Sequence, residues 1–185
     1  MSTEKKPPLT ILVVPVNAVG HTNACAGATR SLLSRGHRVV FLLEEAFRSR
    51  LISLGFEEFI YTFPKQSETA ASKPGDTLAK SLEEHQLVAP NQTTLEKLEH
   101  WRRLLGSPDY RRGIVALNEG VKNALKAIKP DLIYYDGNWL APAIYYSNLP
   151  YIKNISVVPS FYEFEEGLVP GGSGNHLFKL IFRKF

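Results

Sequence analysis

The sequence predicts an α/β protein with a Rossmann-like open parallel sheet and helices on both faces. Residues 11–16 form a continuous apolar run, as expected of a strand that is buried on both faces, and residues 38–43, which are apolar after Arg38, predict a second strand. Between them, the small apolar residues of 22–35 recur at helical spacing, so strand and helix alternate along the first sixty residues. This alternation favours parallel pairing, because each helix returns the chain to the start of the next strand.

Glycine marks the ends of the next predicted elements. The helix at 22–35 is expected to end at Gly36, since glycine adopts the left-handed conformation that commonly follows a helix C-terminus. Residues 46–54 predict a short helix closed in the same way by Gly55. Residues 59–63, which alternate and are rich in aromatic side chains, predict a third strand.

Residues 64–92 interrupt the alternation with prolines and small polar residues, and a short helix is predicted at 78–87. So long an excursion from a compact domain is often functional or mobile. Two longer helices follow, each with an apolar face at helical spacing. These faces consist of Leu95, Leu98, Trp101 and Leu105 in the first helix, and of Ile114, Leu117, Val121, Leu125 and Ile128 in the second.

The last predicted elements return to the pattern of strand and helix. Residues 131–135, "DLIYY", predict a fourth strand with Asp136 at its C-terminal end. A helix is predicted at 139–147, where Pro142 is tolerated near the first turn. Residues 151–158 predict a fifth strand.

The expected domain organisation is simple. Residues 1–9 are expected to be a flexible lead-in, and 10–185 a single Rossmann-like domain. The stretch 177–185, "LFKLIFRKF", is expected to expose apolar surface that promotes association. No closing element follows it, so we expect the domain to be cut short.

Composition excludes several classes of partner and suggests a compartment. The net charge is only +4, and the basic residues are scattered rather than interleaved with aromatics, so a nucleic-acid partner is not expected. The single cysteine, Cys25, excludes an internal disulfide and a cysteine metal site, and it fits a reducing compartment. The sequence holds no signal-peptide core and no apolar run long enough to cross a bilayer, which predicts a cytoplasmic protein without a membrane span.

Two histidines follow glycine, and topology distinguishes them. Ligands of open parallel sheets bind beyond the carboxyl ends of the strands. His21 lies at that edge, after a loop predicted at 17–20 and at the start of the first helix, whereas His37 precedes the second strand at the opposite edge. We therefore expect chemistry at His21 and a surface role for His37 in a helix-to-strand turn. The alternative for His21 is a loop histidine bound to a nearby carbonyl.

Asp136 is the candidate partner of His21. It ends the fourth predicted strand and therefore lies on the same edge of the sheet. If the first and fourth strands are neighbours, its carboxylate can accept a hydrogen bond from one ring nitrogen of His21 and leave the other nitrogen to act as a base. The alternative for Asp136 is a helix N-cap, which is common for aspartate at this kind of junction.

Other chemistries lack their motifs. The first loop, "NAVGHTNACAG", is not the glycine pattern of dinucleotide-binding domains, and the sequence holds neither a phosphate-binding P-loop nor a nucleophile elbow. The five histidines lack the spacing of metal ligands, so no metal site is expected.

The ordered motifs of residues 10–160 resemble the N-terminal domain of UDP-glycosyltransferases of the GT-B fold. That family typically opens with a strand, a Gly-His loop, a helix ending in Arg-Gly-His, and a second strand followed by spaced phenylalanine, leucine and Gly-Phe. Here these features are Gly20-His21, Arg35-Gly36-His37, Phe47, Leu51 and Gly55-Phe56. The later "IKPDLIYYDGNWLAPAIYYSNLPYI" resembles the family's Pro-Asp-Leu strand, its catalytic-partner aspartate and the elements beyond.

The resemblance implies a role for each candidate site residue. His21 would be the general base that deprotonates an acceptor hydroxyl, with Asp136 as its partner, and the sugar would be transferred with inversion. Asn17, Gly20 and Thr22 would line the cleft, and the region 64–105 would shape an acceptor pocket. Trp139 and Phe161 would contact an apolar acceptor, with core packing as the alternative.

The resemblance also implies the substrates. The donor would be a UDP-sugar, the acceptor a small lipophilic molecule with a hydroxyl group, and no metal or other cofactor would be needed. In the family, a second, C-terminal domain holds most of the UDP-sugar, and the 185 residues do not contain it. We therefore expect the chain alone to be inactive.

Two other interpretations stay open at this point. The same half-domain could serve as a non-catalytic module that binds a small molecule or a protein. It could also be an unrelated Rossmann-like domain that binds a nucleotide directly.

Overall fold

The computed structural model describes residues 7–62, 73–137 and 141–154. They form one five-stranded parallel sheet in the order β3-β2-β1-β4-β5. The strands are β1 (Thr10–Val14), β2 (Arg38–Glu44), β3 (Glu57–Tyr61), β4 (Leu132–Asp136) and β5 (Tyr151–Asn154). The helices are α1 (Val19–Ser34), α2 (Asp76–Glu84), α3 (Thr94–Gly106), α4 (Pro108–Ile128) and α5 (Pro142–Tyr145). The predicted α/β class, with a Rossmann-like open parallel sheet, is confirmed.

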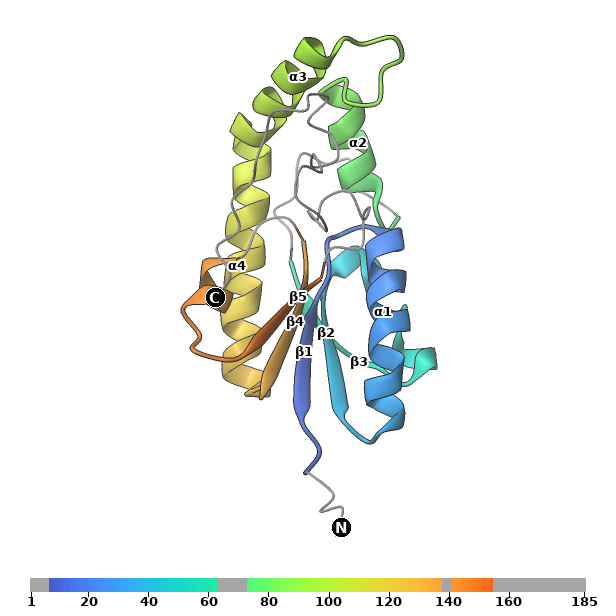
Figure 1. Cartoon of the computed structure of the whole chain (residues 1–185), viewed down its shortest axis with the longest axis vertical. Coiled ribbons are helices and arrows are strands. Elements are labelled where there is room, and N and C mark those ends of the chain that lie inside the picture. Colours follow the sequence, from blue (N-terminus) through green and yellow to red (C-terminus); the bar gives the residue numbers. More distant parts are fainter. Residues whose placement is uncertain (1–6, 63–72, 138–140, 155–185) are drawn as a thin grey trace, which may run out of the picture.

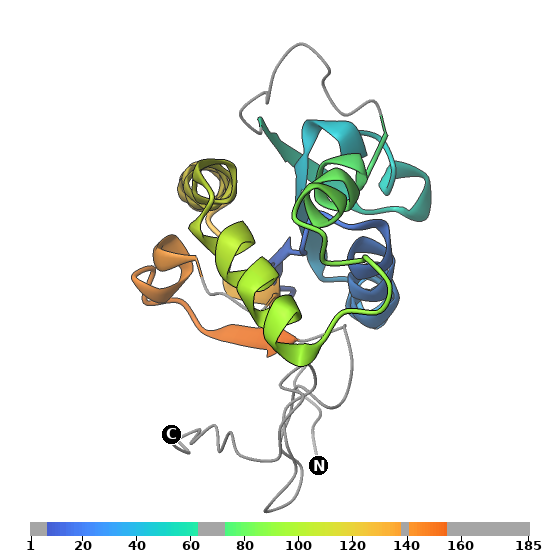
Figure 2. The same cartoon turned by 90° about the horizontal axis from the view of Figure 1, so that it is seen from above.

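Helices cover both faces of the sheet, as predicted. On one face, α1 packs on alternate residues of β1 and β2, including Ile11, Val13 and Phe41. On the other, α4 packs on the intervening residues, including Leu12 and Leu42. The two helices lie on opposite sides of the sheet in both views (Figures 1 and 2). The central strands are therefore buried on both faces, which explains their unbroken apolar runs.

The helix α4 lies unusually close to the edge strand β3. A Cβ atom built on Gly120, in the middle of α4, would lie 2.9 Å from both Cβ and Cγ of Tyr61. The side chain of Tyr61 is itself buried against this helix. Glycine at position 120 is therefore a packing requirement, which sets how closely α4 approaches the sheet.

The first helix begins earlier than predicted. It starts at Val19 rather than at residue 22, so Gly20 and His21 belong to its first turn and not to a preceding loop. Its end matches the prediction, because Gly36 adopts a φ of 88°, in the left-handed region that glycine tolerates best.

The prediction of a helix at 46–54 is wrong. Two 3₁₀ turns, Glu45–Phe47 and Ile52–Leu54, stand in its place. Ser49 between them has a φ of 64°, which breaks a helix. The Glu58 carboxylate accepts hydrogen bonds from the backbone N–H groups of Ser49 and Leu51, at 2.6 and 2.7 Å. A side chain from β3 thus takes donors that a helix would have satisfied internally.

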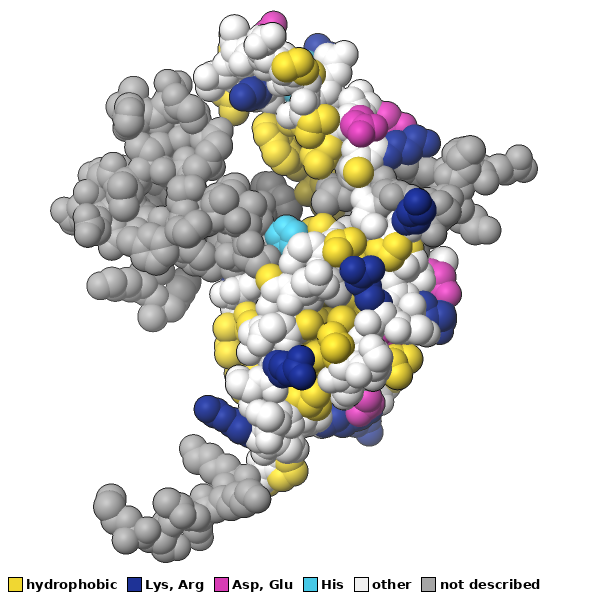
Figure 3. Space-filling view, turned by 90° about the vertical axis from the view of Figure 1, so that its right-hand side faces the viewer, with side chains coloured by type: hydrophobic (Ala, Val, Ile, Leu, Met, Phe, Trp, Pro, Cys, Tyr) yellow, Lys and Arg dark blue, Asp and Glu magenta, His cyan; other side chains and the backbone are white. Residues whose placement is uncertain are grey.

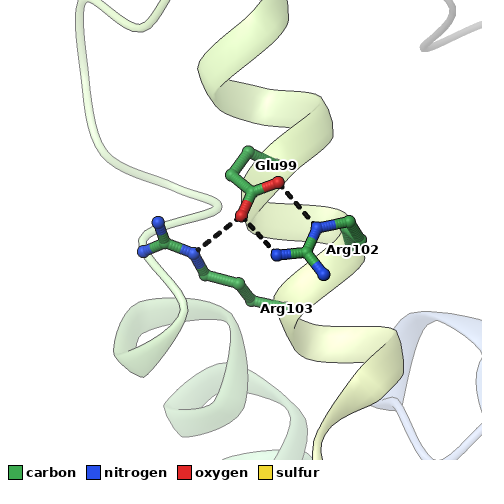
Figure 4. A network of polar contacts seen from close by, with 3 residues as sticks. All are labelled: Glu99, Arg102 and Arg103. Carbon is green, nitrogen blue, oxygen red and sulfur yellow. Dashed lines mark hydrogen bonds and ion pairs between the residues drawn. The ribbon is translucent and has the colours of Figure 1, made fainter.

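The helical excursion lies beyond the carboxyl edge of the sheet. In Figure 1, α2 and α3 stand above the ends of the strands, and α4 descends from α3 along the sheet. A capping box starts α3: Thr93 accepts from the backbone N–H of Glu96, and the Glu96 side chain accepts from the backbone N–H of Thr93. The Glu99 carboxylate, which binds Arg102 and Arg103, forms an exposed ion-pair network on the same helix (Figure 4).

The apolar face predicted for α3 does not pack as expected. Leu104 is the residue of this helix that becomes buried, whereas Leu95, Leu98 and Trp101 stay exposed. The reason is position, since α3 stands beyond the sheet edge and only its last turns reach the core. None of the described helices combines the length and the apolar character needed to cross a bilayer.

The later elements are shorter than predicted or only partly described. The helix predicted at 139–147 appears as α5, a single turn with Pro142 at its first position, and the strand predicted at 151–158 is described as far as Asn154. The stretch 177–185 and the lead-in 1–6 lie outside the described residues.

Candidate active site

The strand order creates a switch point between β1 and β4. From β1 the chain proceeds outward through α1 to β2, whereas from β4 it proceeds through α5 to β5 on the other side. Chain segments therefore diverge at the carboxyl ends of these two neighbouring strands, where open α/β sheets bind their ligands. The adjacency of β1 and β4 is the condition on which a contact between His21 and Asp136 depended.

His21 and Asp136 form a hydrogen-bonded pair at this switch point. His21 Nδ1 lies 2.8 Å from Asp136 Oδ2. His21 comes from the first turn of α1 and Asp136 is the last residue of β4, and the two are 115 positions apart in the chain. The Asp136 side chain is fully buried, whereas that of His21 keeps 19% of its surface exposed. The histidine is thus the member of the pair that a ligand can reach.

The geometry selects one tautomer of the imidazole. An ionised carboxylate only accepts hydrogen bonds, so His21 Nδ1 carries the proton that it shares with Asp136. Nε2 is then the unprotonated nitrogen that can take a proton from a bound molecule. This is the arrangement of a general base with an orienting partner.

Two further side chains bind Asp136. The side-chain amide of Asn154, the last residue of β5, donates from Nδ2 to Asp136 Oδ1 over 3.3 Å. The thiol of Cys25, one turn after His21 on α1, lies beside the Asp136 carboxylate. Burial raises the pKa of this thiol first of all, and the neighbouring negative charge of Asp136 raises it further. Cys25 is therefore a neutral donor.

The sequence interpretation missed Asn154. Because the fifth strand is predicted to run to residue 158, Asn154 falls in the interior of that strand and not at the edge of the sheet. The register of the sheet, which the sequence does not encode locally, pairs Asn154 with Asp136 and makes the two neighbours at the same edge. The N-cap alternative for Asp136 does not occur, since the residue before α5 is Ala141.

The residues predicted to line the cleft have different surroundings. Asn17 Nδ2 donates to the hydroxyl oxygen of Tyr61 over 2.6 Å, which ties the segment after β1 to the end of β3. Gly20 faces open space, because an added Cβ would meet no atom within 4 Å. Thr22 is only 1% exposed, and its hydroxyl has no hydrogen-bond partner among the described residues. Trp139 and Phe161 lie outside the described residues.

A second group of ionisable side chains ends β2 and β3 at the same edge. Glu44 is 8% exposed, and burial raises the pKa of its carboxyl group above the ordinary value. Burial likewise raises the pKa of Tyr61, whose hydroxyl therefore stays protonated at neutral pH. Glu44 pairs in register with Tyr61 and has the strand parity of Leu42, so this group lies on the α4 face, whereas the dyad lies on the α1 face.

His37 has the structural role expected for it. Its Nδ1 accepts a hydrogen bond from the backbone N–H of Leu9 at 3.0 Å, at the amino end of the strands and far from the dyad. In the part of the chain that the structure describes, no three histidine, cysteine or carboxylate side chains gather as metal ligands would.

The region beyond the carboxyl edge exposes apolar surface. In the space-filling view, hydrophobic side chains gather below the upper helices around a hollow (Figure 3). On α3, the exposed fractions are 76% for Leu95, 47% for Leu98 and 46% for Trp101. These three residues recur every third position, so they lie along one face of the helix.

Comparison with solved structures places this fold among glycosyltransferases. The glycotransferase of kitacinnamycin aligns with a TM-score of 0.50 and 21% identity, covering 80% of this chain and 30% of that chain. SsfS6, a glycosyltransferase of Streptomyces sp. SF2575, aligns with a TM-score of 0.53 and 16% identity, covering 78% of this chain and 38% of that chain. No family model and no curated protein matches the sequence.

These alignments establish a shared fold, that of a Rossmann-like parallel sheet found in glycosyltransferases. The chain spans about a third of the length of the two solved structures. At these identities the likeness concerns the path of the backbone alone.

Proposed function

We propose that this chain is the acceptor-binding half of an inverting UDP-glycosyltransferase, with His21 as the general base and Asp136 as its partner. The observation that carries the proposal is the hydrogen-bonded pair at 2.8 Å, with a buried carboxylate and a partly exposed imidazole, at the switch point of the sheet. The shared fold with glycosyltransferases supports it.

In the proposed reaction, His21 Nε2 removes the proton of an acceptor hydroxyl. The acceptor oxygen forms a bond to the anomeric carbon of the sugar while the bond from that carbon to the UDP oxygen breaks. UDP leaves with the bonding electron pair on the opposite face, so the configuration inverts. Asp136 stabilises the imidazolium that results. Proton transfer of this kind contributes about 10²–10⁴-fold in rate.

The acceptor proposed is a small lipophilic molecule that carries a hydroxyl group. The exposed leucines and tryptophan of α3, beyond the edge at which the dyad lies, support this class of ligand. The UDP-sugar would be held mainly by a second domain, as the resemblance implies, and no cofactor is needed for the steps above. The free cysteine, Cys25, fits the reducing compartment of a cytoplasmic enzyme.

The test compares His21→Ala and Asp136→Asn with His37→Ala as the matched control. Binding of a phenolic acceptor is measured on the 185-residue chain, and transfer from UDP-glucose is measured on the chain alone and with a nucleotide-sugar-binding domain joined to it. We expect acceptor binding by the chain alone, transfer only in the joined protein, and a loss of about 10²–10⁴-fold in kcat for His21→Ala. His37→Ala should retain activity.

The proposal fails if His21→Ala transfers sugar as fast as His37→Ala. Binding of a nucleotide to the chain alone, tighter than binding of any phenol, would instead favour a nucleotide-binding domain of another kind.

A further inference from the structure

Besides His21, two described side chains from different elements lie against Asp136, and both can donate a hydrogen bond. Asn154 reaches its Oδ1 from β5 at 3.3 Å, and the Cys25 thiol reaches the carboxylate from α1. The carboxylate is fully buried, as is Cys25, so water does not take over these contacts. Each contact uses a side chain that donates, and a buried carboxylate needs donors on both oxygens.

We propose that Asn154 and Cys25 are positioning residues that orient the Asp136 carboxylate toward His21 Nδ1 and thereby fix the tautomer of the imidazole. Asn154 fills Oδ1, which leaves Oδ2 as the oxygen that faces the histidine. Cys25 lies four residues after His21 on the same face of α1, so one helix carries both the base and a support for its partner. The role in catalysis rests on the proposed function, whereas the role in setting the tautomer does not.

A role in packing alone, without hydrogen-bond donation, predicts a different response of His21 to substitutions of Asn154 and Cys25. Cys25 also belongs to the apolar cluster under α1, and Asn154 ends an edge strand of the described sheet. If only the volumes of these side chains mattered, isosteric replacements would leave His21 unchanged. If donation matters, an isosteric replacement that accepts instead of donating should disturb the dyad as much as a deletion does.

The experiment measures the tautomer of His21 by ¹⁵N chemical shifts of its ring in the 185-residue chain, without substrate. His37 is the internal reference, because its Nδ1 accepts from Leu9 and must carry its proton on Nε2. The variants are Asn154→Ala, the isosteric Asn154→Asp, Cys25→Ala, and Cys25→Ser, which keeps a donor.

In the unsubstituted chain we expect His21 to carry its proton on Nδ1. Asn154→Asp, Asn154→Ala and Cys25→Ala should each convert this single form into a mixture of tautomers. Cys25→Ser, which keeps a donor, should retain the single form, and His37 should stay unchanged in every variant. An unaltered His21 signal in both Asn154→Asp and Cys25→Ala would overturn the proposal. If Asn154→Ala unfolds, Asn154→Asp decides the outcome, because it keeps the side-chain volume.

Transfer assays separate this proposal from the proposed function. In the joined protein, Asn154→Asp should lower kcat by about tenfold with KM nearly unchanged, as expected when a base is misaligned and binding is intact. If the tautomer responds but no variant or parent chain transfers sugar, positioning stands and the enzymatic function fails. If transfer depends on His21 but substitution of Asn154 and Cys25 leaves the His21 tautomer unchanged, the positioning proposal fails and the proposed function stands.

Discussion

At the scale of single residues, burial decides what each ionisable group at the carboxyl edge can do. Asp136 is buried, and its two carboxylate oxygens lie within hydrogen-bonding distance of His21 and Asn154. Glu44, two strands away in the sheet, is buried on the other face, and burial raises the pKa of its carboxyl group. A buried carboxyl group thus has hydrogen-bond partners at one position, whereas at the other burial makes its charged form costly.

The Glu44 carboxyl group should make stability fall with rising pH. Because its pKa in the folded state is raised above the ordinary value of 4.5, the folded chain binds this proton more tightly than the unfolded chain. The protonated form is favoured below pH 4.5, and its contribution is lost as pH rises through the folded-state pKa. Glu44→Gln should therefore raise the melting temperature at pH 7 and leave it unchanged below pH 4.5.

Glu57 is the matched control for that experiment, because its contribution to stability should change with pH in the opposite direction. The Arg38 guanidinium, bound to Glu57 at 2.7 and 2.8 Å, lowers the pKa of the Glu57 carboxyl group. Its contribution is present above pH 4.5 and is lost as pH falls, so Glu57→Gln should lower the melting temperature slightly at pH 7. A fall at pH 7 for Glu44→Gln as well would contradict the assignment of Glu44 as a buried, costly charge.

At the scale of elements, two glycines within helices have different reasons to be there. Gly120 of α4 faces Tyr61 at a distance that excludes a Cβ atom, whereas Gly27 of α1 has no atom within 4 Å of the same position. Helix propensity favours alanine over glycine by about 1 kcal/mol at either site. Only at Gly120 does packing oppose that preference.

We expect Gly120→Ala and Gly27→Ala to change stability in opposite directions. Overpacking against Tyr61 typically costs about 1–3 kcal/mol, which exceeds the gain in propensity. Gly120→Ala should thus lower the melting temperature by several degrees, and Gly27→Ala should raise it by about 2–4 °C per kcal/mol gained. Thermal unfolding followed by circular dichroism measures both. Equal stabilisation by the two substitutions would show that α4 can move away from β3.

The elements also show where local patterns are sufficient. The burial of β1 and β2 and the end of α1 at Gly36 follow from apolar runs and from the conformational freedom of glycine, both of which are local. The region 46–54 has an apolar pattern compatible with a helix, but Glu58 binds its backbone from the neighbouring strand. A side chain from outside the segment overrides the local preference.

At the scale of the whole molecule, the single cysteine reports on the integrity of the fold. Cys25 has no exposed surface and lies where α1 packs on the sheet, and burial raises the pKa of its thiol. Reaction with a thiol reagent requires both exposure and ionisation. Labelling of Cys25 therefore requires α1 to separate from the sheet.

We expect an aromatic disulfide reagent at pH 8 to label the native chain at least about a thousandfold more slowly than the chain in concentrated urea. That ratio corresponds to the lower end of the stability of ordinary domains. The labelling rate is followed by absorbance as urea is raised. Labelling of the native chain within the mixing time would show that α1 opens without global unfolding.

The sequence by itself determined the class of fold, the carboxyl edge at which His21 and Asp136 both lie, and the ends of several elements. Each of these follows from a pattern that repeats within one strand or one helical turn. Tertiary structure alone decided that Asn154 lies within hydrogen-bonding distance of Asp136, that Gly120 must lack a side chain, and that residues 46–54 form no α-helix. These outcomes depend on contacts between elements, whose distances and directions are set by the register and packing of the sheet, and no local periodicity encodes them.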